Sequence, residues 1–99
     1  MEIQLGQIYC LKTESEIAHP HIVVDVKESM VTVLGITTNM KKLSMPGIFV
    51  LEAGEGGLEK QSIVETYKSF VVKQSDLTEY IGKIDLEKLK SIINSKIAQ

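Results

Sequence analysis

The spacing of apolar residues changes its period once along this chain, and that change constrains the fold more than any other feature. Up to residue 84 the apolar residues fall in short runs rich in β-branched side chains, separated by turn-forming residues. After Asp85, a good helix N-cap, they follow at helical spacing. The apolar stripe of that helix consists of Leu86, Leu89, Ile92, Ile93 and Ile97. The sequence therefore predicts a β-rich body whose open mouth is covered by one C-terminal helix.

Length and composition place these elements in one domain. Two cores within 99 residues would both be marginal, so we expect residues 1–99 to form a single domain. No stretch is apolar and uncharged for long enough to cross a membrane, and the N-terminus lacks the pattern of a secretory signal. Cys10 is the only cysteine, which excludes an internal disulfide and favours a packed core residue over a reactive thiol. These features predict a cytoplasmic protein.

The charge composition argues against binding that depends on electrostatics alone. The chain has 13 acidic and 11 basic residues, and all of the basic residues are lysines. Proteins that bind nucleic acid usually carry a basic excess and use arginine for forked contacts to phosphates and bases. The composition still allows a small ordered site that contains a few lysines.

Five strand-like runs can be placed along the chain, at residues 7–12, 21–26, 30–36, 48–52 and 62–73. The second run begins just after Pro20, and a turn at residues 27–29 joins it to the third run in a hairpin. The polar segment 37–42 is expected to leave the sheet as a loop. The last run is interrupted near Lys68, which indicates either two short strands or one bent strand, as in a small sheet that curls into a barrel.

A histidine pair is the clearest chemical feature. His19 and His21 are two residues apart, so in a strand they share one face, and that face can meet Thr37 if the two strands are neighbours. Histidine is suited to proton transfer near neutral pH. The plainer interpretation is two half-exposed or hydrogen-bonded surface residues. A metal site is disfavoured because no further ligand stands at a matching spacing, so we expect neither a metal nor another cofactor.

Local phrases spread over nearly the whole chain carry a family resemblance. They are Gly6-Gln7-Ile8-Tyr9, Glu14 ahead of His19-Pro20, the apolar strand at 21–24, Ile36-Thr37, Pro46 with Ile48-Phe49-Val50, the phrase 57–64, and Leu77 with Ile81-Gly82-Lys83-Ile84 before the closing helix. In order and spacing they resemble the MazF/PemK toxins of type II toxin–antitoxin systems. The resemblance implies a mainly β fold, a small SH3-like barrel of about five to seven strands closed by a C-terminal helix.

The resemblance also implies an activity and partners. Toxins of this family cut single-stranded RNA without a metal, usually as homodimers, and a cognate antitoxin protein covers the same groove. Thr37 occupies the position of the family's threonine at a strand end, and His19 stands where the family has an arginine before proline. We therefore expect His19 to act in acid/base catalysis and Thr37 to donate a hydrogen bond to the phosphate.

Further residues are expected to help to hold the substrate, and most of them also have a plainer interpretation. Thr38 suits an ordinary strand end, and two neighbouring lysines suit a solvated loop tip. The set expected to bind RNA is Glu14, His21, Thr38, Lys41 and Lys42.

Two other function classes stay open at this point. The first is a catalytically inactive barrel whose groove binds a peptide or nucleic acid, since the chain has no arginine to replace the one at the position of His19. The second is a gyrase-directed toxin. Its relatives end in Trp-Gly-Ile, whereas this chain has no tryptophan and ends Lys96-Ile97-Ala98-Gln99, so this class ranks last.

Overall fold

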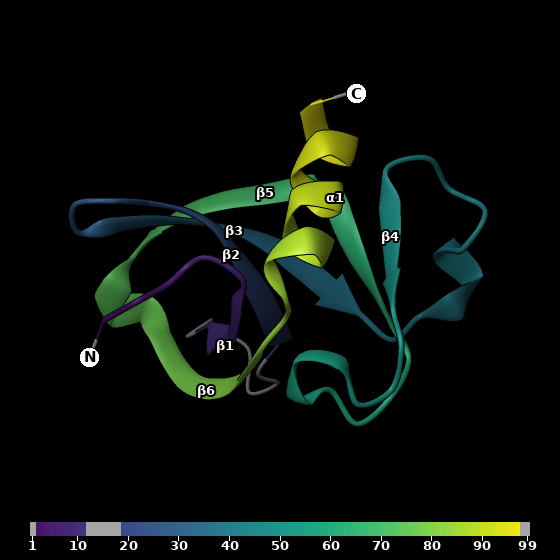
Figure 1. Ribbon diagram of the computed structural model, residues 1–99, viewed down its shortest axis with the longest axis horizontal. Coiled ribbons are helices and arrows are strands. Elements are labelled where there is room, and N and C mark those ends of the chain that lie inside the picture. Colours follow the sequence, from purple (N-terminus) through teal and green to yellow (C-terminus); the bar gives the residue numbers. More distant parts are fainter. Residues whose placement is uncertain (1, 12–18, 98–99) are drawn as a thin grey trace.

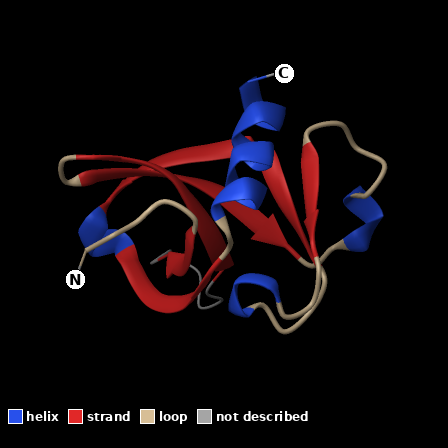
Figure 2. Ribbon diagram, viewed as in Figure 1, coloured by secondary structure: helices blue, strands red, loops and turns tan. Residues whose placement is uncertain are grey.

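One antiparallel sheet forms most of the structure (Figures 1 and 2). The computed structural model describes residues 2–11 and 19–97, except for the side chains of residues 42 and 95–97. Within these residues the six strands are ordered β4-β5-β3-β2-β1-β6. The elements are β1 (Gln7–Leu11), β2 (His19–Lys27), β3 (Met30–Thr37), η1 (Met40–Lys42), β4 (Ile48–Leu51), η2 (Glu55–Gly57), β5 (Ser62–Lys73), η3 (Gln74–Asp76), β6 (Leu77–Lys83) and α1 (Leu86–Ile97), where η marks a short 3-10 helix.

The predicted hairpin is confirmed as β2 and β3, which pair antiparallel up to Lys27 opposite Met30. The predicted start of its first strand is wrong by two residues, because β2 already begins at His19 and includes Pro20. Pro20 lies opposite Cys10 of β1, whereas the pairing of β2 with β3 starts only at His21. At Pro20 the strand thus has a partner on one side only, where a missing N–H group is tolerated.

Strand β6 was not among the strands predicted from the apolar pattern. Its residues are exposed or only partly buried along its whole length, so they show no alternation of apolar and polar side chains. The strand is held instead by antiparallel pairing with β1, which runs from Gln7 opposite Lys83 to Leu11 opposite Leu77.

The sheet curls into an incomplete barrel, in which the end strands β4 and β6 pair with β5 and β1 but not with each other. The turn at η2 packs against β6 in this gap, backbone against backbone. A β-carbon on Gly57 would collide with the carbonyl oxygen of Ile81, and one on Gly82 with the carbonyl oxygen of Gly56. We refer to this contact of Gly56 and Gly57 with Gly82 as the glycine seam. It joins the two ends of the sheet only because these residues lack side chains.

The sequence of residues 62–73 allowed either two short strands or one bent strand, and the structure shows one bent strand, β5. Leu34 on β3 lies opposite Ser69, but the next residue, Gly35, lies opposite Glu65. Residues 66–68 are therefore left over and form a bulge. Thr66 fixes this bulge, because both its N–H and its hydroxyl group donate hydrogen bonds to the carbonyl oxygen of Gly47.

Helix α1 crosses one face of the sheet (Figure 1). Asp85 caps it as predicted, since its Oδ1 accepts a hydrogen bond of 2.8 Å from the N–H of Lys88. Leu89 and Ile92 are buried in a core cluster with residues of five strands and the turn before β5, namely Ile8, Ile22, Leu34, Ile36, Leu51, Leu58, Val64 and Ile84, the last just after β6. Nothing in the described part of the chain forms a helix long and apolar enough to span a membrane.

Part of the predicted stripe on α1 is wrong. Leu86 is 60% exposed, because the contact of the helix with the core begins one turn later, at Leu89. Ile93 is partly buried and packs against the core, and the side chain of Ile97 lies outside the described set.

A second cluster occupies the opposite face of the sheet. It consists of Tyr9, Val23, Val31 and Val33. Because alternate residues of a strand share a face, Gly35 and Thr37 continue the row of Val31 and Val33 along β3. This second face is therefore apolar at the end with Val31 and Val33. At the other end, with Gly35 and Thr37, it has no large apolar side chain from β3, and the candidate site lies there.

The first residue of α1 and a residue in its middle should differ in their effect on stability. Replacing Ile92 by Ala removes a fully buried side chain and is expected to lower the free energy of unfolding by about 2–5 kcal/mol. The matched substitution Leu86→Ala removes an exposed side chain and should change it by less than about 0.5 kcal/mol. Urea titration followed by circular dichroism measures both values, and similar losses would contradict the placement of α1.

Candidate functional site

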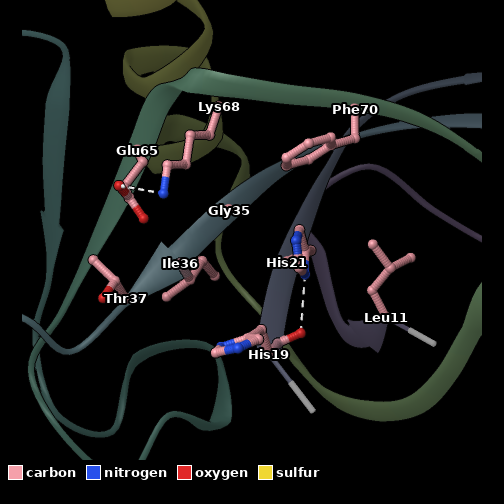
Figure 3. Close-up of a pocket in the computed structure, with 9 residues that line it drawn as sticks. All are labelled: Leu11, His19, His21, Gly35, Ile36, Thr37, Glu65, Lys68 and Phe70. Carbon is pink, nitrogen blue, oxygen red and sulfur yellow. Dashed lines mark hydrogen bonds and ion pairs between the residues drawn. The ribbon is translucent and has the colours of Figure 1, made fainter. Parts of the chain in front are cut away.

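An open cavity of about 350 Å³ lies where the second face of the sheet ends (Figure 3). Strands β2, β3 and β5 supply most of its lining, and β1 adds one residue. The lining residues are Leu11, His19, His21, Gly35, Ile36, Thr37, Glu65, Lys68 and Phe70.

The strand register explains why there is space at this point. His21 lies opposite Gly35, and Gly35 lies opposite Glu65, so the three residues form a row across β2, β3 and β5. A β-carbon on Gly35 would lie 3.7 Å from Cβ of Lys68 and 4.0 Å from Oε1 of Glu65, which is ordinary contact. The glycine thus places no side chain of its own between the imidazole ring and the carboxylate, and the side chain of Lys68 lies beside it, with Cδ 4.0 Å from the position of such a β-carbon.

The bulge of β5 brings a cation to the same place. Nζ of Lys68 lies 3.5 Å from Oε2 of Glu65, with the lysine side chain 46% exposed and the glutamate side chain only 4% exposed. The hydroxyl group of Tyr67 donates a hydrogen bond of 2.7 Å to the same Oε2 atom. Figure 3 shows the carboxylate and the ammonium group side by side at one end of the cavity. A buried acceptor and a half-exposed donor therefore stand next to each other.

His21 is held in one orientation at the middle of the cavity. Its Nδ1 lies 2.9 Å from the carbonyl oxygen of His19, and its ring meets the ring of Phe70 edge to face at 5.9 Å. Since a carbonyl oxygen only accepts, Nδ1 carries the hydrogen, and in the neutral ring Nε2 is left as an acceptor. Burial lowers the pKa of His21 below its ordinary value of 6.5. The hydrogen bond to the carbonyl oxygen of His19 acts against this shift, and the charge of His19 adds a smaller lowering. The neutral form is thus the stable one near pH 7.

The structure brings three of the residues expected at the site together. His19 is exposed and lines the cavity with His21 and Thr37, as the shared strand face predicted. Oγ1 of Thr37 accepts a hydrogen bond of 3.2 Å from the N–H of Asn39, so its own hydrogen remains for another acceptor.

The other expected residues lie elsewhere. Thr38 lines a separate hollow of about 460 Å³, beside Pro20 and Tyr80. Lys41 is exposed on η1, a turn within the predicted loop, and it is not among the residues that line the first cavity. The side chain of Lys42 and all of Glu14 lie outside the described residues.

Sequence reasoning missed Glu65, Lys68 and Phe70. The break in the apolar pattern near Lys68 indicated a bend but not its register, and the register decides which side chains reach the cavity. Over residues 2–11 and 19–97, no group of three or more histidine, cysteine or acidic residues is placed to hold a metal ion. Cys10 is buried, and burial raises the pKa of its thiol, consistent with a packed core residue.

The curled sheet, its single covering helix and the open cavity at the strand ends define a small, incompletely closed SH3-like barrel with a cavity on one face. A family model for the PemK-like, MazF-like toxins of type II toxin–antitoxin systems matches residues 4–99. The chain therefore belongs to this toxin family.

Two solved structures from mycobacterial species share the fold. One is an endoribonuclease in complex with its cognate antitoxin, with a TM-score of 0.78, 18% identity, and coverage of 98% of this chain and 92% of that chain. The other is an endoribonuclease with a TM-score of 0.74, 18% identity, and coverage of 99% and 90%. No curated protein sequence matches the chain.

The buried imidazole makes stability depend on pH. Because the pKa of His21 is lower in the folded state than the ordinary 6.5, the unfolded state binds more protons in this range. The free energy of unfolding should therefore fall as the pH drops below about 6.5. Urea midpoints between about pH 8 and pH 5 measure this decline.

The matched control is His21→Asn, whose side-chain amide can still donate to the carbonyl oxygen of His19 but does not titrate. The decline should be shallower in this variant. Its other titrating groups, including the cavity residues His19, Glu65 and Lys68, are unchanged. Equal slopes in the two proteins would show that His21 does not cause the decline.

Proposed function

We propose that this chain is the toxin of a type II toxin–antitoxin module and cuts single-stranded RNA in the cytoplasm without a metal ion. The observation that carries the proposal is the convergence of His19, His21 and Thr37 on one open cavity. The chain's family and the two structural neighbours, both described as endoribonucleases, support the same reaction class. The whole chain would act as one domain.

Cleavage without a metal requires proton transfer at two oxygens. The 2′-hydroxyl oxygen attacks the adjacent phosphorus and loses its proton to a base, and the 5′ oxygen leaves with a proton from an acid. His21 is suited to act as the base, because its ring is neutral. Its Nε2 can accept a proton while Nδ1 donates its hydrogen to the carbonyl oxygen of His19. His19, which is exposed and lines the cavity, would supply the proton to the leaving oxygen. The products are a 2′,3′-cyclic phosphate and a 5′-hydroxyl end.

Charge that builds on the phosphate oxygens needs a donor. Thr37 ends β3 at the edge of the cavity, and its hydroxyl hydrogen would donate to one of these oxygens. Thr38, and Lys41 and Lys42 on η1, follow directly along the chain and would extend the path of the RNA, as would Glu14 ahead of β2. This role for the four residues is part of the proposal.

The proposal includes two protein partners. One structural neighbour was solved with its cognate antitoxin, and we propose that an antitoxin of this chain covers the open cavity. We also propose a homodimer, since the end strands β4 and β6 each lack a second strand partner within the described residues. Light scattering after size-exclusion chromatography measures the mass in solution.

One observation favours a second candidate, a barrel that binds RNA or a peptide without cutting it. His19 stands where the family resemblance places an arginine, and the chain has none elsewhere. A cleavage assay in EDTA separates the two functions.

The purified protein should cut a long, largely unstructured RNA into discrete fragments in EDTA. His19→Ala is expected to lower the rate by about 10²–10⁴-fold, because the leaving oxygen then lacks a positioned proton donor. Gel electrophoresis of end-labelled RNA measures both rates. Intact RNA with folded wild-type protein would favour the binding module, and full activity of the variant would remove His19 from the mechanism.

A matched pair at Thr37 tests the hydrogen-bond donor. Thr37→Val keeps the shape of the side chain but loses the hydroxyl group, and it should slow cleavage by about 10²–10³-fold. Thr37→Ser retains the donor and should stay within about tenfold of the wild type. Equal rates for the two variants would contradict the assignment.

The role of His21 predicts the acid side of the pH profile. If the neutral ring accepts the proton, kcat/KM should rise with pH through an apparent pKa below 6.5. The rise should disappear in His21→Asn, together with most of the activity. An acid limb that remains unchanged in this variant would assign the base to another group.

A further inference from the structure

Part of the cavity is not used by the cleavage chemistry described above. Gly35 contributes no side chain there, and Glu65, Lys68 and Phe70 line the cavity around it. We propose that this part of the cavity binds one guanine base of the single-stranded RNA, with Phe70 stacking on the base and the Glu65–Lys68 pair reading its Watson–Crick edge. The inference rests on the proposed function, because it takes RNA as the substrate, and it adds a base preference.

The size of the space suits a single unpaired base. A cavity of about 350 Å³ lies at the lower end of the range of small-molecule sites, about 300–1,000 Å³. Because Gly35 has no side chain, a flat group can approach the sheet between His21 and Glu65 when the flexible end of the Lys68 side chain, with Cδ over Gly35, shifts. A base that is splayed out from a single strand can enter such a space, whereas a stacked duplex cannot present one.

Phe70 provides the aromatic surface. It is 45% exposed although it is apolar, and its edge-to-face contact with the ring of His21 holds it beside the cavity. Figure 3 places its ring over the end of the cavity away from Glu65. Proteins that bind single-stranded nucleic acid commonly stack bases on aromatic rings in this kind of position, and stacking does not depend on the identity of the base.

The Glu65–Lys68 pair provides the base preference. The carboxylate only accepts hydrogen bonds, the ammonium group only donates, and the two lie 3.5 Å apart. Guanine presents one acceptor, O6, next to two donors, N1–H and N2–H₂. Lys68 can donate to O6 while Glu65 accepts from both nitrogens, a forked charge-assisted contact. A carboxylate has about four acceptor positions, so contacts to a base can add to the hydrogen bond from Tyr67 and the other interactions of Glu65.

The other bases match this pair less well. Adenine offers one acceptor, N1, beside one amino group, and cytosine offers two acceptors, N3 and O2, beside one amino group. Neither base can donate to Glu65 from more than that one amino group. Uracil has a single N–H group between two carbonyl oxygens, so one of these oxygens faces the carboxylate. The lysine side chain is 46% exposed, so its ammonium group can reach a base while it stays near the buried carboxylate of Glu65.

Binding to uncleavable RNA tests the inference directly. The probes are four oligonucleotides of about seven nucleotides with 2′-fluoro sugars, which lack the attacking hydroxyl, each with G, A, C or U at the centre of a uridine sequence. Fluorescence anisotropy gives the four dissociation constants. The guanine probe should bind about tenfold or more tightly than the others, the scale of discrimination by a forked contact. Equal dissociation constants for the four probes would overturn the inference.

A nearly isosteric variant tests the acceptor. Glu65→Gln can still accept from Tyr67, but it offers one acceptor oxygen instead of two. It should bring the guanine probe to within about twofold of the adenine probe and leave the other three nearly unchanged, since the lost contact belongs to guanine. The control Glu87→Gln makes the same change on the exposed first turn of α1 and should leave all four values as they are. A guanine preference that survives Glu65→Gln would overturn the assignment.

Phe70→Leu tests stacking. It should weaken binding of all four probes by a similar factor, about tenfold, without changing their order. Circular dichroism confirms that each variant is folded. Tight binding of the guanine probe by a protein that leaves RNA intact would overturn the proposed cleavage alone, whereas cleavage without a guanine preference in binding would overturn this inference alone.

Discussion

The bulge of β5 is the constraint on which the candidate site depends. Two hydrogen bonds from Thr66 to the carbonyl oxygen of Gly47 hold it, and they fix three extra residues between two stretches of regular pairing with β3. Without the bulge, a residue other than Glu65 would lie opposite Gly35, and Lys68 would not return to the side of that carboxylate. The loop before β4 thus sets the chemistry of a cavity on another part of the sheet.

The sequence was a good guide wherever the pattern is local. The change of period at Asp85 and the β-branched runs around Glu28 predicted the helix and the hairpin, because each depends on contacts between near neighbours. Strand β6 escaped prediction because it is mostly exposed and held by backbone pairing with β1 at the far end of the chain. Leu86 is exposed although it lies on the predicted apolar face of α1. Helical spacing predicts which face of the helix is apolar, but not how many of its turns the sheet covers.

The same distinction applies to the candidate site. His19, His21 and Thr37 could be grouped in advance, because a two-residue spacing in one strand and a neighbouring strand end are enough to place them. Glu65 and Lys68 could not, since their positions follow from a register shift that depends on Gly47, far away along the chain. A resemblance to a family gives the positions of motifs along the sequence. It does not reveal that the bulge of β5 brings the ammonium group of Lys68 to the site.

The glycine seam between η2 and β6 has an evolutionary consequence. At Gly57 and Gly82 a β-carbon would meet a backbone carbonyl oxygen, which cannot move aside as the end of a flexible side chain can. Selection at these two positions therefore acts on the size of the residue and is indifferent to its polarity. Conservative substitutions are therefore not tolerated at either position, and the two segments could diverge only if the turn between β4 and β5 and its contact with β6 changed together.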